Sequence, residues 1–248
     1  MPDEPRLEEQ ALSEAAEMAI AAQLDDVENI DVAVRTDVLK MVQGRVDSVS
    51  IAAQDVTMHK DIHVQEMELH TDRIALDLLS TLFGQLELDQ PLDATARVVL
   101  TEQDINRALN SDYIQSKFQS LELKVEGELL SVEPQQLKVH LPGDGKMGFS
   151  GTLVLHEIGK SRRIGFTAVI RPPIMKQPLL LEAFQCTQGE GISLELALTF
   201  LNKAKELMDL PYFQLEGIAL RLKKMDVQEG RVTLYTEAYV QQLPDFNL

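Results

Sequence analysis

The sequence contains few cysteines and few basic residues, and each shortage excludes a class of protein. Cys186 is its one cysteine and lies in an apolar segment, so we expect a small buried residue and exclude a disulfide framework or thiolate metal cluster. Basic residues number 23 against 40 acidic residues, for a formal net charge of -17. Sequence-independent binding to nucleic acid depends on lysine and arginine, so this charge argues against it. It also disfavours tight docking on an anionic membrane.

Segments that would target or anchor the protein are missing as well. The first residues are acidic, and no signal-peptide apolar core follows them. The longest apolar run, around Leu179–Leu181, is far shorter than the roughly 18 residues that would span a bilayer. We therefore expect a cytoplasmic protein, with a peripheral position at a membrane surface as an alternative.

The chain does have enough apolar sequence for a sizeable core. It has 248 residues, of which 44% are hydrophobic, and this allows one large β-rich domain or two half-domains. We expect a flexible leader over residues 1–6 and a single domain over residues 7–248.

One apolar pattern occurs twice, over Ile62–Leu76 and again over Leu220–Leu234. In each copy the apolar residues alternate, switch phase at Met67 or Met225, and are followed by an arginine after polar residues. Because successive strand side chains point to opposite faces, a phase switch indicates a bulge or a bend. The repeat therefore predicts one bent β-hairpin design used twice.

The remaining sequence alternates between helical and strand patterns. Apolar residues at steps of three and four predict an amphipathic helix from Leu7 to about Asp25 and further helices over 78–84, 101–109, 112–121 and 196–210. Thr101 and Asp104 have the spacing of a capping box at the start of one of them. The other segments alternate as strands. We predict an α+β fold in which a strongly curved antiparallel sheet, a meander of bent hairpins, wraps around the amphipathic helices.

Motifs for catalysis or cofactors lack their structural context. The glycines of Gly143–Gly148 match a dinucleotide-binding pattern, but a strand follows them, so they predict a hairpin turn. His59 and His63 are four residues apart on a predicted strand, which places them about 13 Å apart, too far for one metal ion. Ser150 lacks the spacing of a nucleophile elbow. We expect no cofactor, no metal and no enzymatic activity.

A family resemblance rests on Val46–Ser50, residues 62–84 and Arg97–Asn106, and on the closing segments Leu215–Ile218 and Gly230–Val232. They resemble the LmeA-like phospholipid-binding family, which was long catalogued as a domain of unknown function. The most specific piece reads Leu-Thr-Glu-Gln-Asp-Ile-Asn and ends at Asn106, and Leu109 follows it. The resemblance covers roughly residues 25 to 243 and is closest to cyanobacterial-type members that lack a signal peptide.

This resemblance implies a tubular lipid-binding (TULIP-like) architecture with a hydrophobic groove for acyl chains. The expected function is non-enzymatic binding of a phospholipid or another acyl-chain lipid, as a carrier or a sensor. The alternative is a β-rich interaction or scaffold module with a packed interior and no ligand, and a hydrolase of lipid esters is a third class. The oligomeric state stays open.

Candidate ligand contacts follow from the helix patterns and from one basic turn. The apolar stripes of the predicted helices supply the candidate lipid-lining residues Leu78, Leu79, Leu82, Phe83, Ile105, Leu109, Ile114, Phe118, Phe200, Leu201 and Leu207. The densest positive cluster supplies the candidate headgroup residues Arg162, Arg163 and Arg171. Acyl chains favour such apolar linings because each buried methylene contributes about 0.8 kcal/mol.

Overall fold

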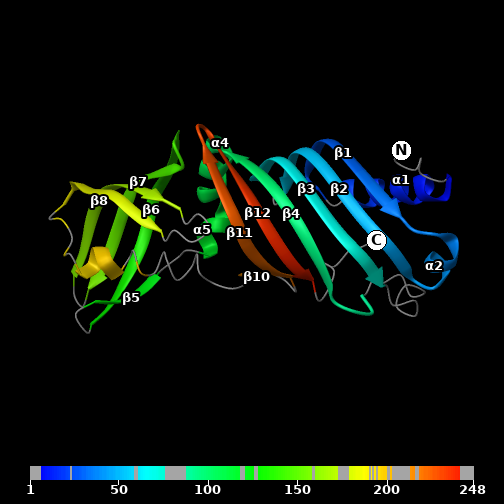
Figure 1. Ribbon diagram of the computed structural model, residues 1–248. Coiled ribbons are helices and arrows are strands. Elements are labelled where there is room, and N and C mark those ends of the chain that lie inside the picture. Colours follow the sequence, from blue (N-terminus) through cyan, green and yellow to red (C-terminus); the bar gives the residue numbers. More distant parts are fainter. Residues whose placement is uncertain are drawn as a thin grey trace.

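Two antiparallel β-sheets dominate the computed structural model (Figure 1). The described residues are 7–22, 24–58, 61–75, 88–117, 121–125, 128–157, 160–172, 179–189, 213–215 and 218–240, with 191, 193, 195–199 and 202. One sheet has seven strands and the other has five, and neither closes on itself in the part of the chain described. The prediction of antiparallel strands with a few helices is confirmed, but the strands form two sheets where one was expected.

The seven-stranded sheet combines both ends of the chain. Its strands, in spatial order, are β1 (Asp26–Arg35), β2 (Arg45–Met58), β3 (Ile62–Ala75), β4 (Leu92–Thr101), β12 (Arg231–Val240), β11 (Ile218–Gln228) and β10 (Phe213–Leu215). The N-terminal meander β1 to β4 is extended by the C-terminal hairpin, because β12 pairs with β4 along its whole length. The predicted strands around residues 30–34, 46–58 and 62–75 and the predicted final hairpin are confirmed.

The repeated pattern gives two different structures. The second copy is a hairpin, in which β11 and β12 meet at a turn containing Gly230. The first copy is the single strand β3, so the predicted hairpin there is wrong. Asp72 occupies the place in the first copy that Gly230, at φ 72°, occupies in the second. Glycine adopts positive φ at little cost, and this permits the turn in one copy only.

The phase switches in the pattern are nevertheless backbone irregularities. In β11 the register shifts between Leu222 and Lys224, just before Met225. Opposite the first copy, Asp55 of β2 has φ 51° beside the place where the pattern of β3 changes face. Within the first copy, Arg73 has φ 54° at the next change. Each irregularity keeps apolar side chains on one face of the sheet.

The described residues include the helices α1 (Leu7–Ala21), α2 (Val38–Val42), α4 (Glu102–Leu109) and α5 (Asp112–Lys117). Helix α1 lies along the edge strand β1, where Ser13 Oγ accepts a hydrogen bond from the backbone N–H of Val34 at 3.0 Å. Glu9 likewise accepts from the N–H of Thr36 at 3.2 Å. Side chains of α1 thus accept hydrogen bonds from backbone N–H groups at the sheet edge, which would otherwise be free to pair with another strand.

The five-stranded sheet is a simple meander. Its strands are β5 (Leu121–Val125), β6 (Glu128–Gly143), β7 (Lys146–Glu157), β8 (Lys160–Arg171) and β9 (Leu180–Gln188). The tight turn between β6 and β7 has Gly143, Asp144 and Gly145 all at positive φ. The glycine pattern is therefore a hairpin turn, as predicted, and Ser150 lies within β7.

Several predicted segments fall wholly or partly outside the described residues. The leader 1–6 and the predicted helix 78–84 lie outside them, and of the predicted helix 196–210 only 195–199 and 202 are described, as helical. Helix α5 ends at Lys117, whereas the predicted helix continued to Leu121, which instead begins β5. No helix in the described part of the chain is long and apolar enough to cross a membrane.

Candidate functional site

One face of the seven-stranded sheet is apolar from β1 to β12. Its central row runs in register across the strands and consists of Val32, Ile51, Leu69, Ala96 and Thr236. Val32 is buried, whereas the other four side chains are only partly buried. The apolar face is thus buried at Val32 and partly accessible to solvent at the other four positions of the central row.

The opposite face of the same sheet is polar around Arg97, although Val99 on that face is buried. Arg97 of β4, the sequence neighbour of Ala96, donates to Glu66 and to Glu68 of β3, both at 3.0 Å. The hydrogen bond to Glu66 is the main reason that the pKa of Arg97 lies above its ordinary value. The two faces therefore differ in chemistry, and only one of them suits an acyl chain.

The five-stranded sheet has an apolar face of its own. Its fully buried cluster consists of Leu123, Leu130, Val132, Leu153, Leu155, Ile164 and Leu196. Phe166 packs against this cluster and stacks on Phe184 with ring centroids 6.1 Å apart. Cys186 packs against this cluster but is only partly buried, whereas a buried residue was expected.

The two apolar faces meet at a joint between the sheets, which also contains helix α4 (Figure 1). Val139 and Leu141 of β6 pack against Val227 of β11 and Val232 of β12 in one buried cluster. The partly buried residues around that cluster are Leu100, Ile105, Leu109, Met147, Phe149, Met225 and Leu234. One apolar cluster therefore includes residues of both sheets.

Side chains of α4 fasten β6 to the joint by hydrogen bonds. The Asn106 amide accepts from the N–H of Val139 at 2.7 Å and donates to the carbonyl of the same residue at 2.8 Å. Glu102 accepts from the N–H of Leu141 at 2.7 Å, and this bond is the main reason that the pKa of Glu102 lies below its ordinary value. Gly230 in the β11–β12 turn donates to the Leu141 carbonyl at 2.9 Å.

Asp104 ties the same helix to the seven-stranded sheet. Its buried carboxylate accepts from the Thr101 N–H at 2.9 Å, completing the predicted capping box, and lies 2.8 Å from Nδ1 of His63 in β3. Burial raises the pKa of Asp104, but hydrogen bonds from Thr101 and His63 lower it by more, so the net pKa is below the ordinary value. This histidine–carboxylate pair belongs to a helix cap that holds the joint.

The predicted lipid-lining residues divide into two groups. Ile105 and Leu109 line the joint, and Ile114 is partly buried on α5. The side chains of Leu78, Leu79, Leu82, Phe83, Phe118, Phe200, Leu201 and Leu207 lie outside the described residues, and lipid contact by all eleven stays a prediction. Sequence reasoning from helices missed the strand residues Ile51, Leu69 and Ala96, although strand alternation was the signal that could have identified them.

The three candidate headgroup arginines all lie on β8 but do not come together. Arg162 and Arg163 are neighbours on opposite faces of the strand, and Arg162 pairs in register with Leu155 on the apolar side. Arg163 donates to Gln135 at 3.2 Å. Arg171 lies nine residues after Arg162, roughly 30 Å along the strand. It is ion-paired with Glu182 at 2.8 Å. Headgroup contact therefore stays a prediction for each arginine separately.

A family model described as LmeA-like phospholipid-binding matches residues 4–237. The chain belongs to the LmeA-like phospholipid-binding family. No curated protein sequence and no solved structure matches it. In this LmeA-like protein the segment that carried the resemblance, Leu100–Asn106, forms the joint, where it supplies the helix cap, the contact with His63 and two anchors for β6.

Acidification is expected to weaken this joint. Glu102 and Asp104 have pKa values lowered by folding, so their contribution to stability is complete above the unfolded value of about 4 and is lost as the pH falls through the folded values. Asp104→Asn should therefore flatten the change in the urea unfolding midpoint between about pH 5.5 and about pH 3. Asp31→Asn, at an exposed position, is the charge-matched control, and an equal flattening in both variants would contradict this account.

Proposed function

We propose that this LmeA-like protein binds a phospholipid without catalysing a reaction, with the acyl chains against the apolar faces of the two sheets. The observation that carries the proposal is the apolar cluster at the joint, which includes residues of both sheets, together with partial exposure at Ile51, Leu69 and Ala96. Membership of a phospholipid-binding family supports the same ligand class.

The energetics favour an acyl chain as the occupant of this face. Each methylene that leaves water contributes about 0.8 kcal/mol, so a chain of ordinary length outweighs unfavourable contacts of its charged headgroup. A hollow of about 820 Å³ between α1, β1 and α2 offers no such lining, because it contains six acidic side chains: Glu9, Glu14, Glu17, Asp31, Asp37 and Asp47. The sheet face is thus the better site for the lipid tails.

The role that follows is shelter of a lipid, as a carrier or a sensor. The histidine–carboxylate contacts His63–Asp104 and His140–Glu102 both involve α4 residues that fasten the joint. A structural use of these groups supports binding without chemistry. The rival account is a scaffold module whose interior is fully packed.

Tryptophan fluorescence can test the site, because the chain contains no tryptophan of its own. Leu69→Trp places the probe on the apolar face, and the control His70→Trp places it on the polar face one residue away. With phosphatidylcholine brominated on its acyl chains, we expect strong quenching of Leu69→Trp and little quenching of His70→Trp. Equal quenching of both probes, or of neither, would contradict binding at this face.

A further inference from the structure

The connection between β1 and β2 presents apolar side chains to solvent. We call residues 35–47, which include α2, the tip. Leu39 and Val42 on α2 are 76% and 71% exposed, and their spacing of three residues places them on one side of the helix. Leu7, at the start of the neighbouring helix α1, is 83% exposed. Figure 1 shows α2 at the end of the molecule far from the five-stranded sheet.

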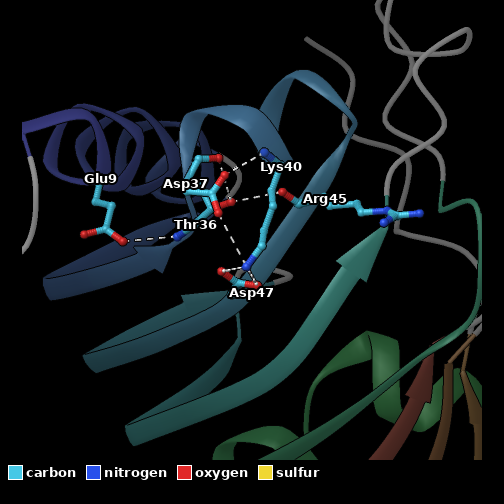
Figure 2. Close-up of polar contacts among 6 residues, drawn as sticks. All are labelled: Glu9, Thr36, Asp37, Lys40, Arg45 and Asp47. Atoms are coloured by element: carbon cyan, nitrogen blue, oxygen red, sulfur yellow. Dashed lines mark hydrogen bonds and ion pairs between the residues drawn. The ribbon is translucent and has the colours of Figure 1, made fainter.

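Polar contacts within the tip order its backbone (Figure 2). Asp37 caps α2 by accepting from the N–H of Lys40 at 2.8 Å. Lys40 Nζ reaches both carboxylate oxygens of Asp47 on β2 at 2.8 Å. Thr36, which is buried, donates through its hydroxyl to the Arg45 carbonyl at 3.0 Å. The exposure of the apolar residues is therefore built into an ordered turn.

The charge of the tip differs from that of the rest of the chain. Residues 35–47 contain three basic and two acidic side chains, a formal net charge of +1. The net charge of the whole chain is -17, so the remaining residues together have a net charge of -18. Both acidic side chains contact Lys40. The exposed guanidiniums of Arg35 and Arg45 form no ion pair within the described part of the chain. Arg35 lines the acidic hollow together with Glu9, Glu14 and Glu17, whereas Arg45 does not line it. The tip therefore combines exposed apolar residues with two guanidiniums that lack an ion pair among the described residues, of which that of Arg45 lies outside the acidic hollow.

We propose that the tip docks this protein on an anionic phospholipid membrane. Leu39 and Val42 enter the boundary between headgroups and acyl chains, and Arg35 and Arg45 contact lipid phosphates from either side of α2. The acidic remainder of the molecule is repelled by such a membrane, which favours an end-on approach by the tip. At physiological salt this repulsion is screened beyond about 8 Å, so the body of the molecule tolerates the approach.

This inference takes the proposed phospholipid binding as its context, because a lipid carrier or sensor must reach the membrane that holds its ligand. The two claims are nevertheless separable. The tip lies at one end of the sheet, whereas the central row around Leu69 lies within it, so variants of one region leave the other intact.

The test is sedimentation of the full chain with vesicles of phosphatidylcholine and phosphatidylglycerol. We expect Val42→Asp to weaken vesicle binding by about tenfold or more, because it places a charge among the inserted residues. Leu129→Asp is the matched control, since Leu129 on β6 is also 71% exposed but lies on the other sheet, and it should bind like the wild type. Arg35→Gln with Arg45→Gln should weaken binding to these vesicles more than to pure phosphatidylcholine.

Single-tryptophan variants test insertion directly. Emission from Leu39→Trp should shift to shorter wavelength on addition of the mixed vesicles, whereas emission from Leu129→Trp should not. No shift, an equal shift in both, or unchanged binding of Val42→Asp would overturn the inference. A change in oligomeric state of Val42→Asp without vesicles would also overturn it, in favour of a second copy of this chain on the tip. If Leu69→Trp carrying Val42→Asp is still quenched by brominated lipid delivered from ethanol, only docking is lost. If docking survives without quenching, only the lipid site fails.

Discussion

Replacing Asn106 with alanine is expected to lower the free energy of unfolding by about 2 to 4 kcal/mol. The variant removes two hydrogen bonds at once and leaves the N–H and the carbonyl of Val139 without their partner at the joint. Each backbone group left unsatisfied on burial costs about 1–3 kcal/mol. Chemical denaturation of both proteins at neutral pH measures the difference.

Gln103→Ala is the control for this loss. Gln103 lies on the same helix but is exposed, so its replacement should change stability by no more than about 0.5 kcal/mol. Asn106→Asp should lie between the two, because it keeps the acceptor for the Val139 N–H and loses the donor to the carbonyl. If Asn106→Ala is no less stable than Gln103→Ala, helix α4 does not fasten β6 in the way described.

Placing a carboxylate on the apolar face is expected to abolish lipid binding. Ala96→Glu introduces a charge in the central row between Leu69 and Thr236, where burial beneath an acyl chain would remove it from water. We expect the amount of phospholipid extracted per mole of purified protein to fall by about tenfold or more. Organic extraction and mass spectrometry measure it.

Thr95→Glu is the matched control for this variant. It adds the same charge one residue away, at an exposed position on the polar face, and should retain the wild-type amount of lipid. Circular dichroism verifies that both variants fold, and Ala96→Gln repeats the test without a formal charge. Equal lipid contents in Ala96→Glu and Thr95→Glu, with both folded, would contradict a site on the apolar face.

The sequence was most informative where one local rule decides the structure. The capping box of Thr101 and Asp104 predicted the start of α4, and the glycines at 143 and 145 predicted the β6–β7 turn. Both are short-range devices, because a side-chain cap or a positive φ acts within a few residues. The alternation of apolar residues likewise predicted the antiparallel strands.

Long-range features needed the structure. The repeated pattern gave no reason to expect a strand in one copy and a hairpin in the other, because the difference rests on Asp72 against Gly230 and on which strand lies alongside. The partnership of Asn106 with Val139 joins residues 33 positions apart, and a sequence pattern does not specify such a pair. The candidate lipid site differs from the prediction for the same reason. The sequence indicated apolar stripes on helices, whereas the apolar face is assembled by pairing of β2, β3 and β4.

Extraction of lipid from the wild-type protein tests whether this protein binds phospholipid. The full chain, purified without detergent and then incubated with phospholipid vesicles and separated from them, is extracted with organic solvent and analysed by mass spectrometry. The account predicts phospholipid at a fixed molar ratio to protein, lost in Ala96→Glu and kept in Thr95→Glu. Absence of phospholipid from the folded wild-type protein, both as purified and after the vesicles, would contradict the account and favour a packed scaffold module.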